Sequence, residues 1–267
     1  RVLYLVGGRT DYNLDSRLSS YGWDVTRLQY NSPEAADYLE LLEDYDLVIM
    51  DGIKDGGQFG ISRADVQEAI LSYVESGGVF MLLCPQITGN FFGVEHPTTS
   101  WRNNNVVKST TDHPITMKPY QGFYNSWDAS ETNGYFTDWE DDGFSRVFHD
   151  SSSSSYGILL EKEVGSGLLL LNAMEIGYPG NAPESDWIAL NIVHYSYDHA
   201  FKRALGNFAK RVNKIVNSPH DYLDNMDNIW VIRHGGAAYM RVHFVSISLE
   251  ENYDNLYLYD STGTLVA

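Results

Sequence analysis

The only cysteine of this chain, Cys84, is the side chain best suited to act as a nucleophile. It ends the apolar run Val79–Cys84, which is typical of a strand buried on both faces. The reactive form of cysteine is the thiolate, so a base within hydrogen-bonding distance is needed to activate it. Without such a base, a cysteine at a strand end is a small buried apolar side chain. We predict this structural role for Cys84.

Polar residues follow several predicted strands. In open α/β sheets, ligands bind beyond the carboxyl ends of the strands. The residues predicted to line this edge and bind a ligand are Gly7, Gly8, Arg9, Asp51, Gly52 and Gln86. A small polar ligand such as a carbohydrate is expected to pack there against a tryptophan, with Trp101, Trp127 and Trp139 as the candidates. A phosphate ligand is not indicated, because neither G-x-G-x-x-G nor a P-loop lysine is present.

Alternating strand and helix patterns in the first half of the chain must position these residues. Strands are predicted at 2–6, 23–28, 47–50 and 79–84, and helices at 13–21, 33–43 and 61–76. This order predicts an α/β fold with a flavodoxin-like, doubly wound parallel sheet. The stretch 91–156 is predicted to be irregular, with the serine run Ser151–Ser155 as a flexible turn.

Two later strands, at 158–163 and 167–172, complete the predicted sheet, and a long helix follows from Ser185 to about Val216. Two interpretations of its basic residues are open: a solvated helix face, which we favour, and a docking surface for an acidic partner. We predict an α/β domain over 1–198, a connecting amphipathic helix over 199–217 and an incomplete all-β sandwich over 218–267.

The motifs GGVFMLLCPQ, DHPITMKP and GSGLLLLNAMEIGY occur in the order found in the class I glutamine-amidotransferase-like fold. The chain from Arg1 to Asp198 resembles this family, particularly its ThuA-like members. The resemblance places Cys84 at the nucleophile and Glu175 in the His-x-Glu pair. Ala173 stands where the histidine is expected, and Leu82 and Gln86 replace the glycines of the nucleophile turn.

The resemblance therefore implies a degenerate catalytic site, in which Cys84 and Glu175 remain as an incomplete triad. Two histidines of the long helix, His194 and His199, are the candidates to replace the missing base in space. A histidine on an amphipathic helix is more simply a core or surface residue. We predict no nucleophilic catalysis through Cys84.

The last fifty residues, Ser218–Ala267, have strand-like alternation at 229–233, 239–248 and 255–259. They resemble CUB-like and pre-peptidase C-terminal modules of secreted proteins. That resemblance implies a calcium site at Glu250 and Asp254, although these side chains fit an ordinary solvated turn equally well. Three strands do not close a sandwich, so we expect the missing strands to come from further chain or from a partner.

The composition restricts the possible partners. A net charge of −18 opposes binding to nucleic acid, and no apolar run approaches the roughly 20 residues of a membrane span. We predict a non-catalytic segment, extracellular or on the cell surface, that acts in protein interaction or assembly, including self-assembly. The alternatives are an accessory region of a larger secreted subtilisin-like protease, and a ThuA-like enzyme or carbohydrate-binding protein.

Overall fold

The computed structural model describes residues 1–7, 13–29, 35–51, 60–102, 105–109, 113–117, 126–128, 132–176 and 183–205, together with Tyr257. The chain divides into two compact units, Arg1–Lys210 and Arg211–Ala267. Apart from Tyr257, the predicted strands of the last fifty residues and the calcium candidates Glu250 and Asp254 lie outside the described residues. The fold below is that of the first unit.

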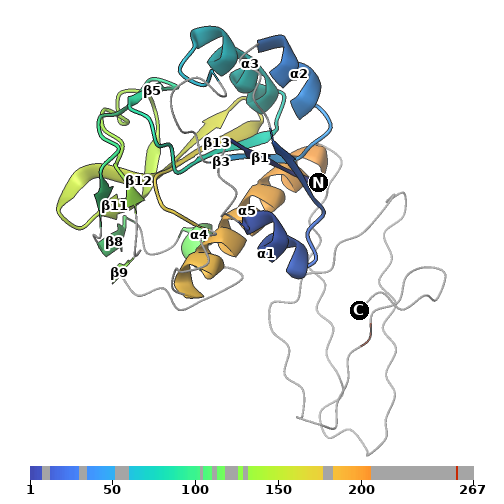
Figure 1. Ribbon diagram of the computed structural model, residues 1–267. Helices are drawn as coiled ribbons and strands as arrows, with labels where there is room; N and C mark the ends of the chain where they lie inside the picture. The colour runs from blue at the N-terminus through green and yellow to red at the C-terminus, as the bar shows by residue number, and fades with distance from the viewer. Residues whose placement is uncertain are drawn as a thin grey trace, which may run out of the picture. The chain divides into compact units, whose positions relative to one another are not determined.

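Within the described residues, nine strands form one sheet in the order β2-β1-β3-β4-β13-β12-β11-β8-β9 (Figure 1). The first five of these strands are parallel and the remaining four are antiparallel. The strands are β1 (Val2–Val6), β2 (Val25–Gln29), β3 (Leu47–Asp51), β4 (Val79–Leu83), β13 (Gly167–Asn172), β12 (Ser153–Val164), β11 (Ser145–Asp150), β8 (Asn105–Lys108) and β9 (Ser126–Asp128). The order 2-1-3-4-13 of the parallel part confirms the flavodoxin-like prediction.

Helices cover both faces of the parallel strands. The helices α2 (Ala35–Leu42) and α3 (Ala64–Glu75) lie on one face, and α1 (Leu14–Ser20), α4 (Pro114–Met117) and α5 (Pro183–Leu205) on the other (Figure 1). Because both faces are covered, every residue of β1, β3, β4 and β13 is buried. No helix among the described residues is long and apolar enough to cross a membrane.

The prediction that 91–156 is irregular is wrong for much of this stretch. Strands β8, β9 and β11 extend the sheet beyond β12, and two short pairs flank it. The pairs are β5 (Gly89–Phe91) with β6 (Val94–His96), and β7 (Trp101–Arg102) with β10 (Thr132–Asn133). The serine run is also not a simple turn, because Ser153–Ser155 begin β12 and only Ser151 and Ser152 form the turn before it. Strand pairing satisfies these polar backbones where sequence composition alone suggested a loop.

Candidate functional site

The carboxyl ends of the parallel strands meet at one edge of the sheet. Val6, Asp51, Leu83 and Asn172, the last residues of β1, β3, β4 and β13, are direct lateral neighbours in register. The sheet thus brings Gly7, Asp51 and Cys84 to a common edge. Gln86 follows two residues after Cys84 and is partly exposed. Of the other predicted ligand residues, Gly8, Arg9 and Gly52 lie outside the described residues.

Cys84 has a left-handed backbone conformation, with φ of 47°. This region is costly for a residue with a Cβ atom and is frequent at functional turns. The Cys84 N–H donates to the carbonyl oxygen of Asn172 at 2.6 Å, which holds the turn against the end of β13. A tight turn therefore forms with Leu82 and Gln86 at the two positions where the sequence resemblance implied glycines. The Cys84 side chain is nevertheless fully buried, at 0% exposure.

The other positions of the expected triad are also closed. Ala173 is fully buried and its N–H donates to the carbonyl of Ile158 at 2.8 Å. Glu175 is 3% exposed. Alanine has no basic atom, so the side chain at position 173 cannot take the role of the expected histidine base.

The two candidate replacement bases lie elsewhere. The His194 ring packs on the ring of Trp23, with 4.9 Å between the centroids, and Trp23 precedes the edge strand β2. Two strands lie between β2 and β4, the strand that precedes Cys84. The spacing between strands alone puts β2 about 14 Å from β4. His199 lies 3.7 Å from Glu163, which pairs with Leu168 near the opposite end of β13, about 13 Å from Asn172 along the strand. Neither imidazole is placed to activate Cys84.

A buried tyrosine–aspartate pair lies at the same edge. The Tyr4 hydroxyl donates to Oδ2 of Asp51, and both side chains are almost wholly buried. Burial, followed by the Asp51 carboxylate, raises the pKa of Tyr4 well above its ordinary value. The Asp51 carboxylate is therefore already bonded to a neutral phenol, and a ligand at this edge would meet that pair.

This pair predicts a loss of stability in alkali. The folded-state pKa of Tyr4 is raised, so its contribution is complete below the unfolded pKa of about 10 and is lost as pH rises through the folded value. Above about pH 10, Tyr4 should lower the free energy of unfolding by about 1.4 kcal/mol per pH unit. Urea unfolding at several alkaline pH values checks this. Tyr4→Phe should show a shallower pH slope than the parent, and equal slopes would refute the assignment.

Two buried amide groups next to Ala173 have unsatisfied atoms. Asn172 accepts the N–H of Met174 on its Oδ1 atom at 2.9 Å, but its Nδ2 has no hydrogen-bond partner and the residue is 0% exposed. Asn133 donates its N–H to the Ala173 carbonyl at 2.9 Å, and its buried Oδ1 is likewise without a partner. Near Ala173, one buried donor (Asn172 Nδ2) and one buried acceptor (Asn133 Oδ1) thus have no hydrogen-bond partner. Buried polar atoms in this state indicate a bound water or a ligand group.

Other sequence candidates are placed differently. Trp139 is buried, its Nε1 donates to the Ser155 carbonyl at 3.2 Å, and it therefore belongs to the antiparallel part of the fold. The side chains of Trp101 and Trp127 lie outside the described residues. Among described residues, no group of three or more His, Cys, Asp or Glu side chains is arranged to hold a metal ion.

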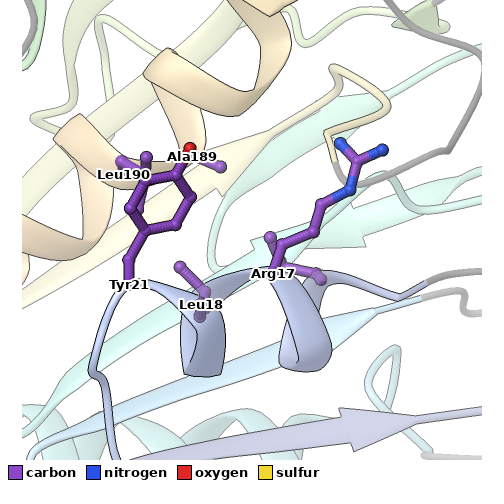
Figure 2. A pocket seen from close by; sticks show the side chains of 6 residues that line it. Arg17, Leu18, Tyr21, Ala189 and Leu190 are labelled. Atoms are coloured by element: carbon purple, nitrogen blue, oxygen red, sulfur yellow. The ribbon is translucent and has the colours of Figure 1, made fainter.

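A small hollow lies between α1 and α5, lined by Leu14, Arg17, Leu18, Tyr21, Ala189 and Leu190. Figure 2 shows the Tyr21 ring lying over Leu190 and Ala189, while Arg17 extends away from them. The space accepts no more than about one water molecule. The hollow is a packing defect between two helices and offers no room for a substrate.

Two further polar clusters were missed in the sequence. Glu161 of β12 accepts hydrogen bonds from His113 Nε2 and the Tyr195 hydroxyl, both at 2.9 Å. Ser109, Arg146 and His149 form the second cluster, between β8 and β11. The sequence signal that could have revealed the second cluster is the strand-like pattern at 105–108 and 145–150. The polar composition of this region obscured that pattern.

No protein-family model matches the chain, and a search of curated proteins finds no match either. Solved structures of similar fold include a cytoplasmic protein of Salmonella typhimurium LT2, with 13% identity, coverage of 74% of this chain and 99% of that one, and a TM-score of 0.49. A protein described as ThuA-like from Parabacteroides merdae has 13% identity, coverage of 80% and 93%, and a TM-score of 0.48. A β-galactosidase from Rahnella sp. R3 has 13% identity, coverage of 76% and 31%, and a TM-score of 0.45. At these values the likeness carries no information on activity, and the fold assignment rests on the strand order.

Proposed function

We propose that this chain acts by binding, and that its amidotransferase-like position has no nucleophilic role. The full burial of Cys84, with Ala173 at the position of the expected histidine, is the observation that carries this proposal. A thiol without access to solvent is not reached by a substrate in solution. The carboxyl edge of the sheet then serves recognition.

The ligand that fits this edge best is a small polar molecule with hydroxyl groups, such as a carbohydrate. A hydroxyl both donates and accepts a hydrogen bond, so it matches the unsatisfied Asn172 Nδ2 and Asn133 Oδ1 atoms. The Tyr4–Asp51 pair and the partly exposed Gln86 supply further polar groups at this edge. Ligands of α/β sheets commonly bind at the carboxyl ends of strands.

Protein interaction or assembly outside the cell, with calcium held at Glu250 and Asp254, stays a prediction of the sequence. Its support is the acidic composition and the CUB-like pattern of the last fifty residues. The role of an accessory region in a larger secreted protease likewise stays a prediction.

The single cysteine makes the proposal directly testable. A colorimetric disulfide reagent should leave the thiol of the native chain unmodified on the timescale in which the same chain in denaturant reacts completely. Calorimetry against a panel of mono- and disaccharides should give binding heat that Asn172→Leu removes and Cys84→Ala retains. Rapid, stoichiometric modification of the native thiol would contradict the structural role of Cys84. The absence of heat across the panel would contradict the carbohydrate assignment.

A further inference from the structure

A serine, a histidine and an arginine meet where β8 ends beside β11. Ser109 follows β8, and its N–H donates to the Val147 carbonyl of β11 at 2.9 Å. The Ser109 Oγ lies 3.1 Å from Nδ1 of His149 and 2.8 Å from Nε of Arg146. All three side chains are partly exposed, in contrast to the buried thiol of Cys84.

The chemistry of arginine fixes one hydrogen-bond direction in this cluster. Guanidinium N–H groups only donate, so Ser109 Oγ accepts from Arg146. The direction of the contact between Ser109 Oγ and His149 Nδ1 depends on the imidazole tautomer. In the tautomer with its proton on Nε2, Nδ1 accepts the hydroxyl proton of Ser109. In this tautomer the serine is aligned to give its proton to the histidine.

The surroundings keep the imidazole in its basic form. Burial, and then the positive charge of Arg146, lower the pKa of His149 below its ordinary value, while Asp150 opposes them. A histidine with a lowered pKa is neutral near pH 7 and can accept a proton. With its proton on Nε2, the neutral imidazole gives the pair the direction that a nucleophile and its base require.

We propose that Ser109 is a nucleophile, with His149 as its general base, and that the pair reacts with activated carboxylic and phosphonic esters. Ser109 Oγ would form a bond to the carbonyl carbon while its proton moves to His149 Nδ1. The ester C–O bond then breaks, and the leaving alkoxide takes the proton back from His149. Water, activated by the same imidazole, hydrolyses the acyl-serine and restores the hydroxyl.

Arg146 has a defined part in this reaction. Its guanidinium lies over the Trp139 ring at 5.2 Å from the centroid, which holds it beside Ser109. A fixed cation next to Oγ stabilises the negative charge that develops as the proton leaves. The same cation makes His149 a weaker base, so activity is expected toward activated esters with good leaving groups. Trp139, predicted as a carbohydrate contact, would thus position Arg146.

This inference goes beyond the proposed function, since it concerns the antiparallel strands β8 and β11 and does not involve the edge that contains Cys84. Its outcome is separable from the thiol and calorimetry tests, because neither of those reports on Ser109. A reactive serine also leaves the conclusion on Cys84 unchanged.

The test is labelling of the full chain with a fluorophosphonate that carries a fluorophore. Attack forms an Oγ–P bond, releases fluoride and passes the proton to His149. The native chain should take up one label, which fragmentation mass spectrometry should place on Ser109. Ser109→Ala should abolish labelling, and His149→Gln should slow it by about 100-fold or more. Ser155→Ala, which removes an exposed serine bonded to Ser153 with no histidine partner, should label at the parental rate.

The rate of p-nitrophenyl acetate hydrolysis should follow the labelling rate: lost in Ser109→Ala, reduced in His149→Gln and unchanged in Ser155→Ala. Circular dichroism shows which variants are folded, and the mapping of the label in the parent chain does not depend on any of them. The proposal is overturned by an unlabelled native chain at saturating probe, by a label on another residue, or by a folded His149→Gln variant that labels as fast as the parent.

Discussion

Gly167→Ala should destabilise the protein by about 3 kcal/mol, the upper end for overpacking a buried site. A Cβ atom at this position would lie 1.9 Å from the Val74 carbonyl oxygen and 2.3 Å from that of Gly78. Both contacts are with backbone, so no side chain can rotate away, and β13 would have to move from α3. Chemical unfolding monitored by circular dichroism measures the change in the free energy of unfolding.

The matched control is Gly143→Ala. Gly143 has a φ of 74°, but a Cβ atom there would meet nothing within 4 Å. In this variant the free energy of unfolding should fall by about 1 kcal/mol, which is the cost of a left-handed backbone for alanine. Gly167 does not have a left-handed φ, so a loss no larger than that of Gly143→Ala would contradict the close approach of β13 to α3 as the reason for this glycine.

Glu161→Ala should cost about 2–3 kcal/mol, because it removes the shared acceptor of two poorly exposed donors. The His113 and Glu161 side chains are 13% and 17% exposed, so water replaces the lost bonds only in part. His113 also accepts the N–H of Ile115 on Nδ1 at 3.2 Å, which directs its Nε2 proton to Glu161. The cluster ties α4 and α5 to β12, and its loss should lower the melting temperature of the whole α/β unit.

The control for this variant is Glu163→Ala, two residues along the same face of β12. The Glu163 side chain is 81% exposed and lies 3.7 Å from His199. An exposed ion pair of this kind contributes at most about 1 kcal/mol. If both glutamates gave the same small effect, the cluster around Glu161 would be a surface contact without a role in holding α4 and α5.

The sequence indicated the site of Gly167→Ala more clearly than that of Glu161→Ala. The motif Gly165-Ser166-Gly167 was identified from the sequence as the start of a late strand, and the structure adds that two carbonyls exclude any side chain at Gly167. His113 was identified only as part of a motif. Its partner Glu161 is 48 residues away, and no local pattern joins them.

The middle of the chain shows why part of the sheet escaped prediction. Strand β8 has only four residues, and both β8 and β11 carry polar side chains. Strand β11 also pairs with β12 through register shifts between Arg146 and Asp150. Such irregularities disturb the alternation by which strands are recognised. The serine run was assigned to a turn because of its composition, although part of it belongs to β12.

The parallel core and the absence of a basic side chain at position 173 follow from the sequence. Long apolar runs indicate strands buried on both faces, and Ala173 has no basic atom in any conformation. The fold was needed to show that the Cys84 thiol is buried, that His194 and His199 lie away from it, and that Ser109 meets His149 across 40 residues of chain. Strand register brings such distant side chains together, and a slip of one residue would turn them to opposite faces of the sheet.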